Sequence, residues 1–212
     1  MQLLDRTELP KPEEKITLYG VTWEQYDTLV SMFMDKFPGL RMTYLEGTLE
    51  IMGTSSEHER LKKIIARLLE MYAVEKRITL NGYGNTTFRK EAKQRGLEPD
   101  ECYCLGELTE VPDIAIEIAI TSGGIDKLAV YQGLGVTEVW FLRMETLPFR
   151  ELVPHSRWQN NQFILYCLQE EAYQQIENSK LLPDLDLVLL SQFVNDDNQT
   201  EAVIAYRDAL SD

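Results

Sequence analysis

The 212-residue sequence has few of the side chains that bind zinc, with three cysteines and two histidines. A structural zinc site takes four such ligands, so a zinc-stabilised fold is not expected. Cys102 and Cys104 are two residues apart in a strand-like run and therefore share one face of the strand. We expect them to pack as small apolar side chains.

The sequence also lacks long apolar runs. None approaches the roughly 20 residues of a membrane-spanning helix, and the first ten residues have no apolar centre of a signal peptide. With three cysteines and no export signal, the expected location is a reducing cytoplasm. Neither a G-x-S-x-G elbow nor a G-x-x-x-x-G-K-[ST] loop occurs, so serine hydrolases and P-loop NTPases have no support.

Positive charge is scarce overall but concentrated in one region. The chain has 21 Lys and Arg against 35 Asp and Glu, a net charge of −14 that disfavours nucleic acid as a partner. Residues 60–95 nevertheless hold ten Lys or Arg against three Glu. This region is either an ordinary solvated helix face with a charged loop, or a basic surface for nucleic acid. Lys62, Lys63 and Arg67 lie off the apolar stripe of their helix, so we expect them to face solvent.

The length and the order of elements predict one α/β domain at residues 21–212, preceded by a loosely attached N-terminal arm at residues 1–20. Thr22 and Gln25 form a capping box that begins a helix. Residues 40–53 are typical of a hairpin with its turn at Glu46-Gly47. Ser56 and Glu59 form a second capping box, before the helix that carries the basic residues.

The second half of the chain predicts a mixed sheet with a crossover helix. Strands are expected at 77–89, 98–106, 114–120 and 136–143, with a helix at 125–135 before the last of them. Residues 90–96 are interpreted as a polar connection. A hairpin at 163–176 and one or two helices after it are expected to close the domain.

Glu117 is the one charged residue in the apolar run 114–120. An ionised carboxylate there costs several kcal/mol unless it is compensated. It is paired with a cation, buried in its neutral form, or directed to water from a sheet edge. A metal site is a further explanation. Asp100 is on the preceding strand, and two converging carboxylates suit Mg²⁺. Lys127, ten residues after Glu117, could stabilise charge on a phosphate.

The segments "GLEPDECYCLG", "VPDIAIEIAITSGGIDKLAVYQGLGVTEVWF" and "YLEGTLEIMGTSSEHERL" resemble the Uma family of bacterial restriction-endonuclease-like proteins. That family belongs to the PD-(D/E)XK nuclease superfamily. The resemblance extends from about residue 22 to residue 142. It implies a restriction-endonuclease-like mixed central sheet flanked by helices, with an added C-terminal hairpin and helix. It also implies a Mg²⁺ (or Mn²⁺) site and hydrolysis of phosphodiester bonds.

The same resemblance assigns roles to particular positions. The Pro-Asp pair ending at Asp100 corresponds to "PD", and Glu117 to "(D/E)". Ala119 occupies the position of the motif lysine, and Lys127 on the next helix is the residue that fits in its place. Glu46 matches the additional upstream acid, so the implied metal ligands are Glu46, Asp100 and Glu117, with Lys127 as the fourth catalytic residue.

A second Pro-Asp pair ends at Asp113. This residue shares a strand face with Glu117 but stands about 13 Å away at strand rise, which is too far for one metal. We therefore interpret Asp113 as a residue at the start of a strand.

His58 begins the basic helix, where the helix N-terminus favours the neutral ring. It is either a base, a phosphate contact or part of the capping turn. Together with Lys62, Lys63 and Arg67 it forms the set of candidate nucleic-acid contacts.

The sequence thus predicts a Mg²⁺-dependent DNA endonuclease that acts as a homodimer, since two sites cut two strands. Two alternatives remain open at this point. One is an inactive nuclease fold that binds nucleic acid or protein, which the acidic charge and Ala119 favour. The other is a metal-dependent hydrolase of small phosphorylated molecules.

Overall fold

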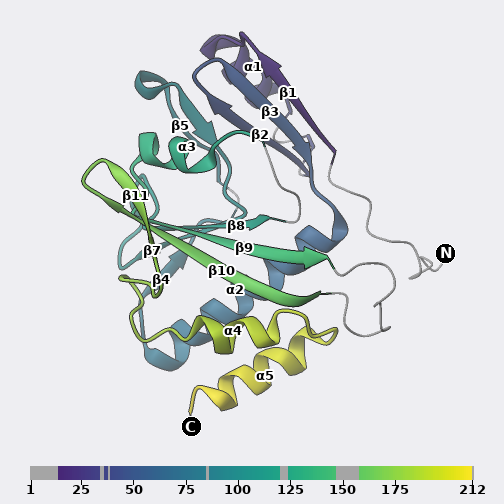
Figure 1. The fold of residues 1–212 in the computed structure, drawn as a ribbon, viewed down its shortest axis with the longest axis vertical. Helices are drawn as coiled ribbons and strands as arrows, with labels where there is room; N and C mark the ends of the chain where they lie inside the picture. Colours follow the sequence, from purple (N-terminus) through teal and green to yellow (C-terminus); the bar gives the residue numbers. More distant parts are fainter. Residues whose placement is uncertain are drawn as a thin grey trace, which may run out of the picture.

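The computed structural model describes residues 14–33, 36–37, 39–84, 86–119, 124–146 and 158–211. Its strands form two sheets, one of five strands and one of six (Figure 1). The α/β class predicted from the sequence is confirmed. The predicted mixed central sheet is the six-stranded one, and the other strands pair among themselves in a second sheet.

The five-stranded sheet is antiparallel throughout. Its strands, in spatial order, are β1 (Lys15–Tyr19), β3 (Thr48–Gly53), β2 (Leu40–Leu45), β6 (Arg95–Leu97) and β5 (Phe88–Lys90). The predicted hairpin is present as β2 and β3. Its turn residues Glu46 and Gly47 have φ angles of 43° and 87°. Positive φ at both central residues is the two-residue turn that matches the twist of paired strands.

Strand β1 corrects the expectation of a loose arm at residues 1–20. It pairs with β3 along its whole length, from Lys15 opposite Met52 to Tyr19 opposite Thr48. The two prolines that suggested an arm, Pro10 and Pro12, lie outside the described residues. The segment directly after them is therefore an edge strand of the sheet.

Helix α1 (Trp23–Phe33) packs on one face of this sheet. The predicted capping box is present. The Thr22 backbone N–H donates to Gln25 Oε1 at 2.8 Å, and the Gln25 N–H donates to Thr22 Oγ1 at 3.3 Å. The start of the helix is therefore fixed by local hydrogen bonds, as a capping box requires.

The six-stranded sheet is mixed. Its order is β11 (Ala172–Ile176), β10 (Trp158–Gln169), β9 (Glu138–Thr146), β8 (Ile114–Ala119), β7 (Glu101–Leu105) and β4 (Leu80–Gly82). Only β8 and β9 are parallel, and α3 (Lys127–Leu134) is the crossover helix between them. The C-terminal hairpin β10–β11 continues this sheet rather than lying apart from it.

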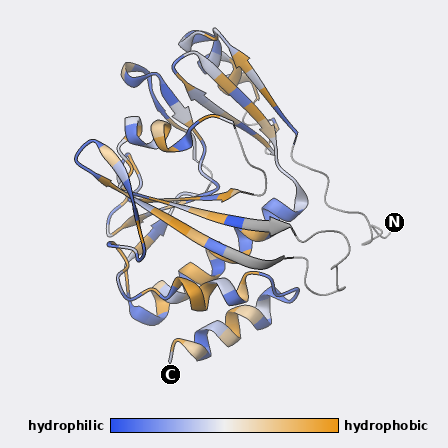
Figure 2. Ribbon diagram, viewed as in Figure 1, coloured by the Kyte–Doolittle hydropathy of each residue, from blue (hydrophilic) through white to orange (hydrophobic). Residues whose placement is uncertain are grey.

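Helices cover both faces of the six-stranded sheet. The long helix α2 (Ser56–Lys76) packs on one face with α4 (Leu187–Phe193) and α5 (Gln199–Ala209), and α3 packs on the other. Figure 2 shows the hydrophobic central strands β8, β9 and β10 between these layers. Among the described residues, no helix combines the length and the apolar character needed to span a membrane.

The segment 77–97 differs most from its prediction. The one strand expected at 77–89 is two short strands, β4 and β5, which belong to different sheets. Gly84, with φ of 64°, lies between them where the chain changes direction. The predicted polar connection contains a 3₁₀ turn (Glu91–Lys93) and strand β6.

Gly96 on β6 lies against Tyr26 of α1, so substituting it tests how tightly α1 packs on the five-stranded sheet. A Cβ at this position would lie 2.3 Å from Tyr26 Oη, and the fully buried Tyr26 ring stacks on Tyr44 at 4.8 Å. Because the ring has no room to yield, we expect Gly96→Ala to lower the free energy of unfolding by about 1–3 kcal/mol in urea denaturation. Gly53→Ala is the matched control, since a Cβ there meets no heavy atom within 4 Å. Equal stability of the two variants would contradict this packing.

Candidate active site

Asp100 directly precedes β7 and lies beside Glu117, which is inside β8. These strands pair with Glu101 opposite Ile116, and the same register places Asp100 opposite Glu117. The Ile118 backbone N–H donates to Asp100 Oδ2 at 2.8 Å, which ties Asp100 to the neighbouring strand. Asp100 is 2% exposed and Glu117 is 1% exposed. The structure therefore brings the two predicted carboxylates into one buried position.

His58 holds Asp100 from the start of α2. Its Nε2 lies 3.1 Å from Asp100 Oδ2. Burial alone would raise the pKa of Asp100, but the His58 hydrogen bond, the charge of Lys127 and the Ile118 N–H lower it to about 2. Asp100 is thus kept ionised. Because His58 is fully buried, the prediction that it contacts nucleic acid is wrong for this structure.

The local fold at the start of α2 explains why His58 turns inward. The N-cap is Ser55, whose side chain accepts from the His58 backbone N–H at 3.1 Å. The predicted capping box at Ser56 was one residue late. This shift places His58 in the first turn on the buried side of the helix.

Lys127 supplies the ammonium group that Ala119 cannot. Its Nζ donates to Glu117 Oε2 at 2.6 Å. Lys127 is the first residue of α3, and the N-cap Asp126 fixes that start by accepting from Ala129 N at 3.3 Å. The predicted migration of the lysine from the strand to the helix therefore agrees with the geometry.

Tyr131 lies one helical turn after Lys127 and donates to Glu117 Oε1. Residues four apart on a helix share a face, so both side chains reach the same carboxylate. The tyrosine was missed in the sequence, although its spacing from Lys127 was a usable signal. Both oxygens of Glu117 are hydrogen-bonded as a result.

The pKa values of the ion pair move in the same direction. Burial raises the pKa of Glu117, against the opposing charge of Lys127. Burial alone would lower the pKa of Lys127, but the carboxylates of Glu117 and Asp100 outweigh it and the net shift is upward. Lys127 therefore remains an ammonium group at neutral pH.

Glu46 is not at this site. It lies in the β2–β3 turn, its side chain is 68% exposed, and it pairs with Arg95 at 2.8 Å. Four residues further along, about 13 Å at strand rise, Glu50 is buried and its charge raises the pKa of Lys127. The structure thus favours Glu50 over Glu46 as the upstream acid. The sequence did carry a signal for Glu50, namely a lone carboxylate in an apolar strand. The same kind of signal identified Glu117.

The backbone before α3 approaches Glu50 closely. Ile125 N–H donates to Glu50 Oε2 at 3.3 Å, and Lys15 Nζ lies 3.9 Å from the same oxygen. A Cβ on Gly124 would stand 2.1 Å from it, and Gly124 has φ of +119°. Both constraints require glycine here. Glu50 therefore joins the five-stranded sheet to the connection that carries Lys127.

The predicted basic surface is only partly present. Lys63 is exposed, but the Lys62 side chain is 11% exposed and lies 4.0 Å from Glu59. Arg67 is half-buried and donates to Gln199 at 3.3 Å, because α5 packs beside α2. Their expected solvent exposure is therefore wrong for Lys62 and Arg67. Tertiary packing, which the apolar stripe of α2 does not report, covers them.

Asp113 behaves as the sequence predicted. It directly precedes β8, and its Oδ2 accepts from the Leu105 backbone N–H at 2.8 Å. The cysteines also follow expectation, since Cys102 and Cys104 are both fully buried thiols. Of the two Pro-Asp pairs, the one ending at Asp100 is therefore the pair that lies beside Glu117.

The donor set fits a hard cation in one respect. His58 Nε2 and the Ile118 N–H both meet Asp100 at Oδ2, which fixes the carboxylate in one orientation. In the described ranges no three His, Cys, Asp or Glu side chains gather closely enough to hold a metal by themselves. Mg²⁺ does not require this, because it binds through one or two carboxylates and keeps its waters. Asp100 and Glu117 are the residues that could hold it.

A crossover helix whose lysine reaches a strand carboxylate, beside a second carboxylate on the adjacent strand, is the arrangement of a restriction-endonuclease-like protein. The comparison with protein families narrows this class. The model of the Uma2 family, described as "Putative restriction endonuclease", matches residues 23–200. Because this match covers most of the chain, the protein belongs to the Uma2 family. No curated protein matches the chain.

The ion pair makes a prediction about stability in metal-free buffer. In Lys127→Met the buried Glu117 loses its cation, so its pKa rises further and the folded protein holds a proton that the unfolded chain releases. The free energy of unfolding of Lys127→Met should fall below that of the parent by a small amount near pH 5 and by more at pH 8. The difference grows by about 1.4 kcal/mol for each pH unit over which the folded variant holds the proton. Urea unfolding with EDTA at both pH values measures it.

The double variant Glu117→Gln, Lys127→Met is the control, because it removes the group that takes up the proton. Its stability relative to the parent should change much less between the two pH values. An equal deficit of Lys127→Met at pH 5 and pH 8 would show that Lys127 does not compensate Glu117.

Proposed function

We propose that the protein is a Mg²⁺-dependent endonuclease that hydrolyses phosphodiester bonds of DNA. The observation that carries this proposal is the Lys127–Glu117 contact beside Asp100, in a chain whose family is described as a restriction endonuclease. Two buried carboxylates and a cation at one sheet end have no packing role that apolar residues would not fill better. The arrangement is costly to fold and suited to phosphate chemistry.

Asp100 and Glu117 are the proposed ligands of Mg²⁺ or Mn²⁺, with Glu50 as the acid nearest to them on the other sheet. When bound, the metal polarises the phosphodiester and lowers the pKa of a water molecule. His58 keeps Asp100 ionised and oriented, and Tyr131 fixes the rotamer of Glu117. The carboxylates are thus held in place before any metal arrives.

Lys127 acts in this proposal through its charge. Its raised pKa keeps the ammonium group protonated at neutral pH, so it does not accept the proton of the attacking water. It instead orients that water or stabilises negative charge on the phosphate in the transition state. The side chain is 25% exposed, which leaves it a route to substrate.

The proposed substrate is DNA, and a homodimer would present one site to each strand. The proposed location is the cytoplasm, where the three buried thiols remain reduced. An inactive nuclease fold is the second candidate, favoured by Ala119 at the lysine position and by the net charge of −14. Activity measurements separate these two functions.

The test compares plasmid cleavage by purified variants with Mg²⁺, Mn²⁺ or EDTA. Asp100→Asn, Glu117→Gln and Lys127→Met should each lower the cleavage rate at least about 100-fold, the cost of removing one electrostatic group from such a site. Glu50→Gln should also lower it, whereas Glu46→Gln should leave it within about twofold because that carboxylate is exposed and remote.

Glu46→Gln is the matched control for Glu50→Gln, since it makes the same chemical change four residues earlier on the same hairpin. A parent protein that cuts no DNA with either metal would favour the inactive module. Cleavage of small phosphate esters without cleavage of DNA would favour the small-molecule hydrolase. Sedimentation of the parent measures whether the chain dimerises.

A further inference from the structure

A cleft of about 440 Å³ lies between β1 and the segment that leads into α3. Its volume is typical of a site for one small ligand. The residues that matter for its chemistry are Lys15, Thr17, Tyr19, Thr48, Gly124 and Ile125. One wall is therefore the edge strand that the sequence suggested was a loose arm.

Strand geometry places the polar residues of β1 along this wall. Side chains alternate between the faces of a strand, so Lys15, Thr17 and Tyr19 share one face, while Ile16 and Leu18 share the other. Lys15 and Tyr19 are about 13 Å apart at strand rise. The cleft is thus bordered by a cation near one end of β1 and an aromatic ring near the other.

The Lys15 end of the cleft reaches Glu50, the acid whose charge acts on Lys127. Thr17 pairs with Glu50 across the sheet, and Lys15 Nζ lies 3.9 Å from Glu50 Oε2. The same oxygen accepts from Ile125 N–H, two residues before Lys127. A molecule in the cleft would therefore lie next to Glu50 and to the start of the segment that carries Lys127.

Tyr19 marks the other end and is 81% exposed. An exposed ring at one end of the cleft, a lysine at the other and two threonine hydroxyls among its lining offer the two kinds of contact that a nucleic-acid strand needs. The ring stacks on a base, and the ammonium and hydroxyl groups meet phosphate oxygens. A flat base is accessible to such a ring only when it is unpaired.

We propose that this cleft binds one unpaired nucleic-acid strand next to the bond to be cut. The proposal rests on the proposed function for its direction, because the Lys15 end reaches Glu50. Its chemistry does not depend on cleavage, since Tyr19 and Lys15 lie outside the Asp100, Glu117 and Lys127 cluster. The substrate class that follows is single-stranded DNA or a duplex with a frayed or flapped end.

The experiment measures binding of a fluorescein-labelled oligothymidine by anisotropy in EDTA, where metal-dependent cleavage cannot occur. Tyr19→Ala should weaken binding about 5- to 100-fold, the range for loss of one stacked base. Lys15→Gln should weaken it and flatten the slope of log affinity against log salt by about 0.7, the value for one phosphate contact on a single strand.

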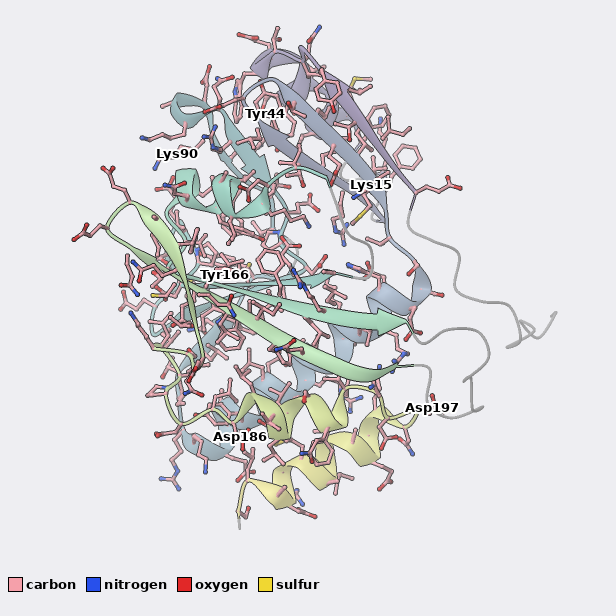
Figure 3. All side chains as sticks on the ribbon, viewed as in Figure 1. Lys15, Tyr44, Lys90, Tyr166, Asp186 and Asp197 are labelled. Atoms are coloured by element: carbon pink, nitrogen blue, oxygen red, sulfur yellow. The ribbon has the colours of Figure 1, made fainter. Side chains whose placement is uncertain are left out.

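Two variants serve as controls. Ile16→Ala changes a 62% exposed side chain on the opposite face of β1. Lys90→Gln removes a lysine charge, as Lys15→Gln does, but from β5, the other edge strand of the five-stranded sheet. Figure 3 shows Lys15 and Lys90 on opposite sides of that sheet. Both controls should bind like the parent.

The outcomes separate this proposal from the proposed function. Three results would each overturn the cleft assignment. They are equal binding by Tyr19→Ala and Ile16→Ala, tighter binding by the parent of a blunt-ended DNA duplex than of the oligothymidine, and no binding of either by the parent. In those cases the proposed endonuclease function would still be supported if the parent cleaves plasmid and Asp100→Asn does not. Weaker binding by Tyr19→Ala in a protein that cuts no DNA would support the cleft and reject the endonuclease.

Discussion

The contact between Lys127 and Glu117 is the interaction on which the site depends. An ionised glutamate in the middle of an apolar strand is unfavourable unless a cation and hydrogen bonds compensate it. Lys127 and Tyr131 provide both from one face of α3. Because α3 is the crossover between the two parallel strands, the same contact fixes the helix against the sheet. Stability and site geometry are therefore linked through one carboxylate.

Two further elements converge on this pair from opposite sides. The first turn of α2 contributes His58, which holds Asp100, and β3 contributes Glu50. The acids outnumber the two lysines beside them, Lys127 and Lys15, so the site retains an excess of negative charge. An excess of this sign attracts a divalent cation and repels phosphate. In the proposed endonuclease, a bound cation would reconcile the acidic site with a DNA substrate.

The sequence predicted the parts of the site that a local pattern reports. Glu117 was identified because a lone charge in an apolar run needs a reason, and Lys127 because the resemblance implied a lysine on the next helix. Glu46 was assigned from the resemblance alone. Glu50, four residues later, is brought to the segment before α3 by the packing of β3, which a local pattern does not report. The inward turn of His58 and the covering of Arg67 by α5 depend on tertiary contacts. Strand β1 was missed because an edge strand pairs on one side only and carries a weak pattern.

The short connection between β8 and α3 has a consequence for how the chain can vary over evolution. Gly124 admits Glu50, Asp126 caps the helix and Lys127 meets Glu117, all within four residues. An insertion or deletion within residues 124–127 would change the spacing of all three contacts at once. The Glu46-Gly47 turn, by contrast, takes any residues that accept positive φ as far as its side chains are concerned, because its contacts to Val21 and Gln94 are made by its backbone. We therefore expect natural variants to change residue type in the hairpin turn and chain length in exposed loops, while residues 124–127 keep their spacing.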